Sequence, residues 1–487
     1  MGVVNGSRIA RNFLALSAAQ GVAMLTGLFT TAWLARALQP EAFGVVGFGA
    51  AFLSYFLIVV VFGTDRLAMR EMARDPDGIP GLLPRLIGLR IALLFAAALA
   101  YFLVIEVIDQ PDRVKNVMRI QALGLAAAAM SLDFVYQALE RMHVIGLRQA
   151  ASSVLVLAAT LALIDGPEDV LIAAAIPHAV LICTAVWLGF RIQRDTKAIA
   201  VSFDFRAWGS LLRRSFPMAV ILAMATVYLT IDILMLGFMD TAHAVGLYTG
   251  AARIYAIVGV LGGLLVAVFL PALSAAFGTA DRMQAVYREF AFFMLFLALP
   301  AVAAAGCFPS ELVRVVLGEG FLAVAVTLSV LMGAAGINLL NQINAASLLS
   351  WNREKAQMYT QGAGAALNVA LNLVLIPHYG ILGAAAASVV SELVACTVMV
   401  GLIGRGYAAA LLRPVLGLGL CAGFAFGAVL AADALTGGAL TPTSSAAGFA
   451  IKAGIACLLY GGAAWMTGLV DPARMWRLAL RRDRPAA

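Results

Sequence analysis

Four arginines lie inside or at the edges of long apolar segments of this chain, and they are the first candidates for chemistry. A charged residue at the centre of a membrane helix costs about 2.5 to 3.5 kcal/mol, so such residues usually face a partner or a water-filled cavity. Arginine stays charged and can donate two parallel hydrogen bonds to one phosphate group. We therefore predict a cavity for an anion, with the candidates Arg36, Arg66, Arg90 and Arg253.

Each arginine also has a structural explanation. Arg66 stands in a run of charged residues, where a solvent-exposed ion pair within a loop is the favoured alternative. Arg36 can keep its aliphatic stem in the apolar layer and place its guanidinium group at the outer membrane interface. Arg90 can pair with Asp133 or Glu140. Arg253 has no such route to a membrane interface, and a role in the cavity is favoured for it.

Two carboxylates also lie within apolar segments. Glu392 is about 11 residues into its segment, roughly 16 Å at 1.5 Å per residue, which is the bilayer midplane. A buried carboxylate that is exposed first to one side of the membrane and then to the other could link proton exchange to a conformational switch. For Glu392, coupling to a proton or sodium ion and a structural role both stay open. Asp232 is expected to form an ion pair with Arg253 rather than a coupling site.

Amide side chains gather in a segment between residues 323 and 349. Asn341 and Asn344 stand three apart, on one face of a helix. Such amides can hydrogen-bond sugar hydroxyls or hold helices together. We favour helix contacts for any single residue and sugar contacts for the cluster, which comprises Asn338, Asn341 and Asn344 with Gln342.

Composition assigns the chain to the integral membrane proteins. Of the 487 residues 63% are hydrophobic and 12% are charged, and the mean hydropathy is +0.96. No soluble chain of this length keeps such a balance. The apolar segments lack strand-like alternation and predict an all-α fold. There are about fourteen transmembrane helices, at 12–35, 42–63, 84–105, 117–139, 148–164, 169–190, 214–238, 246–273, 286–307, 323–349, 356–376, 381–403, 411–433 and 447–469.

The distribution of basic residues predicts the orientation. With a cytoplasmic N-terminus, 25 of the 33 Lys and Arg fall on cytoplasmic segments and seven on the outside. This bias indicates that both termini are cytoplasmic. The net charge of +7 is thus mostly a topology signal, and because the charges sit in scattered short loops we expect no nucleic-acid partner.

The chain contains a weak internal repeat. The stretch beginning at Arg11 matches the stretch beginning at Arg213 in hydropathy, and at this offset of 202 Gly44 falls on Gly246. Both copies start on the cytoplasmic side, which favours two pseudo-symmetric six-helix bundles as in rocking transporters. The predicted domains are 1–208, 209–405 and a C-terminal part, 406–487, with an extra helix pair and a basic cytoplasmic tail.

Four motifs spread over the first four hundred residues carry a family resemblance. Together they resemble the polysaccharide-transport branch, the oligosaccharide or O-antigen flippases, of the multidrug/oligosaccharidyl-lipid/polysaccharide exporter superfamily. The block from Ile376 to Ser388 is the most specific element. The motifs are LARALQPEAFGVVGFGAAFLSYF (34–56), GTDRLAMREMAR (63–74), TIDILMLGFMDTAHAVGLYTGAARI (230–254) and LNLVLIPHYGILGAAAASVVSEL (371–393).

The resemblance implies a translocase in the bacterial inner membrane that works by alternating access. Its substrate would be undecaprenyl-diphosphate-linked oligosaccharide, moved from the cytoplasmic to the periplasmic leaflet, with a polysaccharide polymerase as a further partner. By resemblance to lipid II flippases, the last two helices would form a groove for the lipid tail, and packing is the alternative. The tail, with Arg474, Arg477, Arg481, Arg482 and Arg484, is expected to lie near anionic headgroups.

Two other functions remain as alternatives. A cation-coupled multidrug extruder shares the architecture but predicts a more acidic, aromatic-lined cavity. A membrane-embedded polysaccharide polymerase or ligase would want a large periplasmic loop with clustered Arg and His, and the four histidines here stand apart. A lipid II flippase is less favoured because its N-terminal arginine cluster has no match. We expect no catalytic centre, cofactor or metal.

Overall fold

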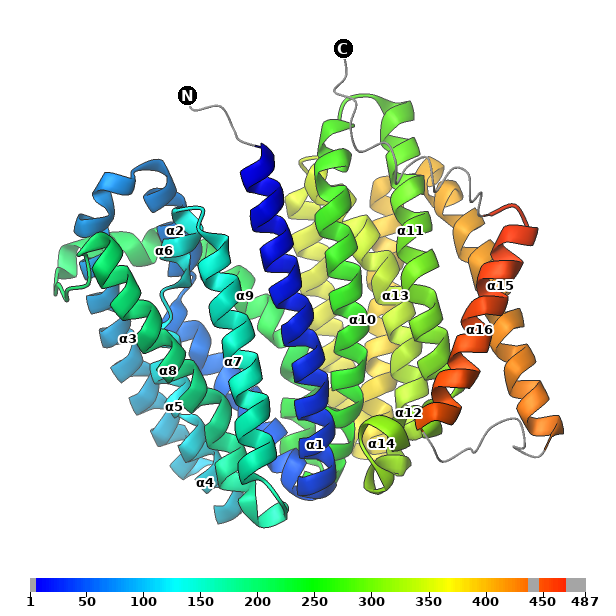
Figure 1. Cartoon of the computed structure of the whole chain (residues 1–487), viewed down its shortest axis with the longest axis horizontal. Coiled ribbons are helices and arrows are strands. Elements are labelled where there is room, and N and C mark those ends of the chain that lie inside the picture. The colour runs from blue at the N-terminus through cyan, green and yellow to red at the C-terminus, as the bar shows by residue number, and fades with distance from the viewer. Residues whose placement is uncertain (1–5, 437–445, 470–487) are drawn as a thin grey trace. The chain divides into compact units, whose positions relative to one another are not determined.

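The computed structural model describes residues 6–436 and 446–469 (Figure 1). These residues form helices joined by short connections and contain no strand, which confirms the all-α prediction. The α-helices are α1 Gly6–Val61, α2 Thr64–Arg74, α3 Ile79–Val107, α4 Asp112–Gln121, α5 Leu123–Met130, α6 Asp133–Ala138, α7 Met142–Leu163, α8 Val170–Thr196, α9 Phe205–Met239, α10 Ala242–Ala275, α11 Ala280–Cys307, α12 Pro309–Val316, α13 Ala325–Ser350, α14 Glu354–Ile403, α15 Arg405–Leu435 and α16 Ala446–Met466.

Twelve helical segments of the described residues are long and apolar enough to cross a membrane, so the protein is a multi-pass membrane protein. The count of fourteen spans stays a prediction. The difference lies in α1 and α14, each of which includes two predicted spans. These helices have 56 and 50 residues, roughly 84 and 75 Å at 1.5 Å per residue, against a hydrocarbon core of about 30 Å.

Helix α1 bends at Gln39. Its φ of 59° and ψ of 169° are non-helical, and Pro40 follows it. Proline has no N–H to donate and disfavours the helical conformation of the residue before it. The Gln39 side chain donates a hydrogen bond of 2.6 Å to the carbonyl of Arg36, which satisfies a backbone acceptor freed by the bend.

Helix α14 bends at Gly380, three residues after Pro377. Its φ of 53° and ψ of −132° suit glycine, which has no Cβ. A Cβ on Gly383 would overlap the carbonyl oxygen of Leu375, so the two arms of α14 touch through their backbones just beyond the bend. The predicted gaps at 36–41 and 377–380 contain both bends.

The predicted span 117–139 is not one helix. It comprises the second half of α4, then α5 and α6, and the chain is non-helical at Ser131 and Leu132. The third part, α6, has six residues. This interruption frees the backbone carbonyl of Ser131 to accept a hydrogen bond from Arg90 at 2.5 Å.

The chain divides into two compact units, residues 1–249 and residues 250–487. In the first unit α1 packs against α3, α4, α7 and α9. In the second unit α13 packs against α11 and α14, and the α15–α16 pair packs against α11. The predicted domain boundaries after residues 208 and 405 stay predictions, and residues 470–487, with the predicted basic tail, lie outside the described residues.

The repeat has a physical counterpart inside the first unit. A Cβ on Gly44 would overlap the carbonyl oxygen of Ala242 and lie 2.6 Å from the nitrogen of Gly246. A Cβ on Gly246 would overlap the carbonyl oxygen of Pro40 and lie 3.0 Å from the nitrogen of Gly44. Since Pro40 and Ala242 also differ by the offset of 202, the contact between α1 and α10 is reciprocal.

A cluster of buried apolar residues at one end of the first unit positions α2. It includes Leu67 and Met72 of α2, Leu83 of α3, Phe134 of α6 and Trp208 of α9, all at most 7% exposed. Burial of one such side chain stabilises the fold by about 1.5 to 3 kcal/mol. The cluster therefore fixes one face of α2, and the opposite face is left for other contacts.

Candidate functional site

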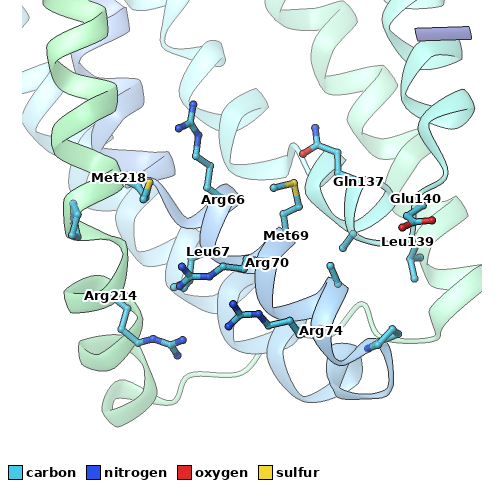
Figure 2. A pocket seen from close by; sticks show the side chains of 14 residues that line it. Arg66, Leu67, Met69, Arg70, Arg74, Gln137, Leu139, Glu140, Arg214 and Met218 are labelled. Atoms are coloured by element: carbon cyan, nitrogen blue, oxygen red, sulfur yellow. The ribbon is translucent and has the colours of Figure 1, made fainter. Parts of the chain in front are cut away.

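A cavity of about 1040 Å³ opens beside α2 in the first unit (Figure 2). Its wall is formed by α2, by the end of α6 with the turn that follows it, and by α9. The charged side chains of the wall are four arginines and one glutamate. They are Arg66, Arg70, Arg74, Arg214 and Glu140.

Three of these arginines form a stripe on α2. Arg66, Arg70 and Arg74 are four residues apart and exposed, whereas Ala68 and Met72 on the opposite face are each 1% exposed. Like charges four residues apart destabilise a helix by about 0.2 to 0.5 kcal/mol per pair. A bound anion would offset this repulsion, and guanidinium groups are suited to bind one.

The fourth arginine comes from a distant part of the chain. Arg214 of α9 pairs with Glu71 of α2 across 143 residues of sequence. This ion pair ties α9 to α2 at the edge of the cavity. Among the described residues Arg66 pairs with no carboxylate, and Figure 2 shows it pointing along the cavity from α2.

Arg90 is in the same end of the molecule but does not line the cavity. Its side chain is 1% exposed, pairs with Asp65, and lies over the ring of Phe134 at 4.9 Å. It also donates to the hydroxyl of Thr64 at 3.2 Å. Arg90 therefore fixes the start of α2, and through it the arginine stripe.

The expected partners of Arg90 have other positions. Asp133 accepts two hydrogen bonds from Arg148 of α7, at 2.8 and 2.6 Å. Glu140 lies on the cavity wall with a φ of 55°. Arg90 thus pairs with Asp65 instead of the expected Asp133 or Glu140. The residues around Arg66, expected to form an exposed loop, form the helix α2.

The remaining predicted residues of the first unit lie away from the cavity. Arg36 is exposed near the bend of α1. Asp232 of α9 is half-buried and accepts a hydrogen bond of 2.6 Å from the hydroxyl of Tyr248. Arg253 belongs to the second unit and is exposed. The pairing of Asp232 with Arg253 stays a prediction.

A buried polar cluster surrounds Glu392 in the second unit. Its carboxylate is 5% exposed and accepts hydrogen bonds from Asn338 at 2.9 Å and from Asn341 at 2.6 Å. The hydroxyl of Tyr255 lies 3.4 Å away, and Gln342 donates to Asn338 at 2.9 Å. The cluster joins α10, α13 and α14 around one acid.

The three predicted asparagines do not act as one set. Asn338 and Asn341 face α14, while Asn344 accepts a hydrogen bond of 2.7 Å from Tyr287 of α11 and is fully buried. No group of three His, Cys, Asp or Glu in residues 6–436 and 446–469 has the arrangement of a metal site. A sugar role for these amides stays a prediction.

Two features of the structure were missed by sequence reasoning. Arg70, Arg74 and Arg214 were counted only as topology signals, although the i, i+4, i+8 spacing on α2 was visible. In the second unit Lys452 is 2% exposed between Asp433 at 2.6 Å and Glu311 at 3.5 Å. This contact joins α16 to α15 and α12, and only the fold brings the three residues together.

Comparison with known proteins assigns the family. Residues 9–277, more than half of the chain, match the family described as "Polysaccharide biosynthesis protein". The chain belongs to this family. It is 22% identical over 271 residues to a protein of Escherichia coli (strain K12) described as "Putative O-antigen transporter". The match covers 54% of this chain and 65% of the relative, a little under two thirds of the relative's length.

Solved structures of two groups share the fold of this family member. The lipid II flippase MurJ in an inward closed conformation has a TM-score of 0.74 at 14% identity, covering 93% of this chain and 98% of its own. An inward-facing multidrug resistance MATE transporter has a TM-score of 0.58 at 16% identity, covering 81% and 95%. At 14% and 16% identity these structures show the fold alone, and the family match confirms the predicted resemblance to a polysaccharide family.

Proposed function

We propose that this protein is a flippase that moves undecaprenyl-diphosphate-linked oligosaccharide from the cytoplasmic to the periplasmic leaflet by alternating access. The observation that carries the proposal is the arginine-lined cavity in a member of the polysaccharide biosynthesis family. On this proposal the protein is a transporter rather than an enzyme, and both termini lie in the cytoplasm.

The chemistry of the cavity fits a diphosphate. A lipid-linked diphosphate that leaves water needs positively charged partners in the protein, because an unpaired charge in a hydrocarbon environment is costly. The stripe on α2 offers guanidinium groups in a row, and each can donate two parallel hydrogen bonds to phosphate oxygens. Arg66, which has no carboxylate partner among the described residues, is the expected first contact.

The size of the cavity fits more than a phosphate. Pockets for small molecules measure about 300 to 1,000 Å³, and this one is about 1040 Å³. It can therefore hold a diphosphate together with adjoining sugars. Gln137 and Glu140 on its wall supply hydrogen-bonding groups for hydroxyls, while the isoprenoid tail stays in the membrane.

The same charges disfavour the two alternatives. A multidrug extruder for organic cations would place its substrate against four arginines, and like charges repel. A polymerase or ligase would need a nucleophile or an acid–base pair in the site, and the cavity wall offers one glutamate among arginines. Both remain outcomes of the tests below.

Energy coupling is a further part of the proposal. Glu392, held by two amides near the middle of α13 and α14, is the group that we expect to exchange a proton or to bind a sodium ion during the cycle. A polysaccharide polymerase on the periplasmic side would then use the translocated lipid.

The test is made in a deletion strain complemented with variants of the α2 stripe. The deletion should accumulate lipid-linked oligosaccharide in the cytoplasmic leaflet and lose surface polysaccharide, and wild type should restore both. The double variant Arg66→Gln, Arg70→Gln should fail to complement, because hydrogen bonds to charged groups contribute about 1.5 to 3 kcal/mol each.

Two controls make the result specific. Arg66→Lys, Arg70→Lys keeps the charge and should complement in part, and Arg282→Gln removes an exposed charge from α11 without touching the cavity. Unchanged lipid-linked sugar in the deletion strain, with new sensitivity to cationic dyes, would favour drug extrusion and overturn the proposal.

A further inference from the structure

The connection between α8 and α9, taken together with the first two residues of α9 as residues 197–206, presents large apolar side chains outward. We call it the interfacial segment. Val201, Phe203 and Phe205 are 50%, 61% and 74% exposed. Leaving one such side chain in water forgoes about 1.5 to 3 kcal/mol, so three of them in five residues indicate a surface that something covers.

The interfacial segment is fixed to α3 rather than loose. The backbone N–H of Ser202 donates to the carbonyl of Pro84 at 3.0 Å, and the indole N–H of Trp208 donates to the carbonyl of Arg85 at 3.1 Å. A Cβ on Gly88 would overlap the carbonyl oxygen of Ser202, so the two backbones touch. The exposed side chains are therefore held in one orientation.

The two phenylalanines pack on a buried tryptophan. Trp208 is 7% exposed, and the rings of Phe203 and Phe205 meet it edge to face at centroid distances of 5.9 and 4.8 Å. One side of each phenylalanine ring contacts Trp208, and the rest of the ring is exposed. The aromatic cluster is thus a rigid apolar projection from the end of the first unit.

Basic side chains surround this projection. Arg194, Lys197 and Arg206 are exposed. The side chain of Arg194 is 76% exposed and lies 3.5 Å from Asp195, a carboxylate that also pairs with Arg141. The acid inside the segment, Asp204, is 3.4 Å from Arg85 and caps α9 by accepting from the backbone of Ala207 at 3.1 Å. The charge left for a partner is positive.

The position of the segment identifies the partner. Both α8 and α9 are long enough and apolar enough to cross a membrane, so a short connection between them lies at a bilayer surface. In Figure 1 it is at the rim of the first unit, where α3 begins. Aromatic rings next to Lys and Arg are typical of the membrane–water interface.

We propose that the interfacial segment is a membrane anchor: Phe203 and Phe205 insert at the headgroup level, and Arg194, Lys197 and Arg206 bind the phosphates of anionic phospholipids. The inference is independent of the transported substrate. It has a consequence for the cavity, because Arg214 is nine residues after Phe205 on the same helix, roughly 13 Å along its axis. The anchor therefore sets the depth of α9 and of the cavity wall that it carries.

The test measures depth in the full-length protein reconstituted in vesicles. A nitroxide is attached at Phe205→Cys after replacing the two exposed cysteines, Cys183→Ser and Cys457→Ser. In phosphatidylcholine vesicles containing phosphatidylglycerol, the label should collide several-fold more often with oxygen than with a water-soluble nickel chelate. Labels at Phe190→Cys in α8 and Asp77→Cys in an exposed connection give the apolar and aqueous limits.

The charge dependence is tested in the same vesicles. Each basic residue near the surface contributes about 1 kcal/mol to anionic-lipid binding, about fivefold. The triple variant Arg194→Gln, Lys197→Gln, Arg206→Gln should lose the response of the label to phosphatidylglycerol, while the double variant Arg194→Lys, Arg206→Lys, which has lysine at all three positions, should keep it.

Two outcomes would overturn the anchor. A label at position 205 that matches the Asp77→Cys label in both kinds of vesicle would place the segment in water or against a protein. A label that is deep but indifferent to phosphatidylglycerol and to the triple variant would show apolar insertion without headgroup binding. Thermal unfolding of each labelled variant, matched to wild type, excludes misfolding as the cause.

Discussion

Arg90 and Asp65 form an ion pair whose two partners are unequally exposed. Arg90 keeps 1% of its side-chain surface in contact with solvent, and Asp65 keeps 45%. Removing one member leaves the other uncompensated, and the penalty is large only where the remaining charge is buried. We therefore expect Asp65→Ala to destabilise the protein by about 3 kcal/mol, and Arg90→Met by less than half of that.

Thermal unfolding in one detergent measures both variants. Arg148→Met, which removes the partner of the half-buried Asp133, is the comparison within the same region. If Arg90→Met is the more damaging of the pair, the buried guanidinium stabilises the fold through packing against Phe134 and not through its charge.

Glu392 offers a second test on single residues. Glu392→Gln keeps one of the two side-chain oxygens that accept from Asn338 and Asn341, but it cannot titrate. If the acid exchanges the coupling proton, the variant should bind substrate as wild type does and lose about tenfold in transport driven by a proton gradient. Transport is measured in vesicles with the gradient imposed and then collapsed.

The companion variant Asn341→Ala separates coupling from structure. It removes a donor to Glu392 and leaves the carboxylate in place. Gradient-driven transport by Glu392→Gln equal to that of wild type would assign Glu392 a structural role, and a sodium gradient tested in parallel distinguishes the two ions.

At the scale of helices, the contact between α1 and α10 makes a steric prediction. Gly44→Ala and Gly246→Ala each place a Cβ onto backbone atoms, which cannot move aside as a flexible side chain can. Overpacking of this kind costs about 1 to 3 kcal/mol. Gly259→Ala, in the same α10 with no described atom within 4 Å of the new Cβ, should leave the unfolding temperature unchanged.

The double variant tests whether the two glycines act at one contact. Neighbouring substitutions couple, whereas distant ones add. Gly44→Ala with Gly246→Ala should therefore differ from the sum of the single effects by more than about 0.5 kcal/mol. Strict additivity would mean that the two backbones are not in contact.

The sequence predicted the helices whose formation depends on their own hydropathy. It did not predict those that depend on contacts with distant parts of the chain. The apolar segments located both bends, because the predicted gaps 36–41 and 377–380 contain Gln39 and Gly380. The sequence indicated that Arg66 lies among charges, but the helix α2 depends on Leu67 and Met72 packing into a cluster with residues of α3, α6, α7, α8 and α9. Arg214 reaches the cavity from 143 residues beyond Glu71, a pairing that no local pattern contains.

For the whole molecule, the open question of fold is the number of crossings. Twelve and fourteen crossings both place the two termini on the same side of the membrane, so locating the termini does not distinguish the two counts. The count depends on whether the bends at Gln39 in α1 and Gly380 in α14 reach the membrane surface. Each arm of these helices has more than 20 residues, enough to cross the hydrocarbon core at 1.5 Å per residue.

We expect the two bends to be exposed on the periplasmic side. Single cysteines at Gln39 and at Tyr379, which is 64% exposed, should react in intact spheroplasts with a maleimide that does not cross the membrane. Asp109→Cys in the α3–α4 connection should react likewise, and Asp75→Cys before α3 should react only after the membrane is permeabilised. Reaction at Asp75 without reaction at Asp109 or at either bend would leave α1 and α14 as single crossings and, with both termini cytoplasmic, the protein with twelve. Reaction at all three, with Asp75 protected, would give fourteen crossings and would place the arginine cavity beside α2 in the cytoplasm, on the side where a lipid-linked diphosphate is made.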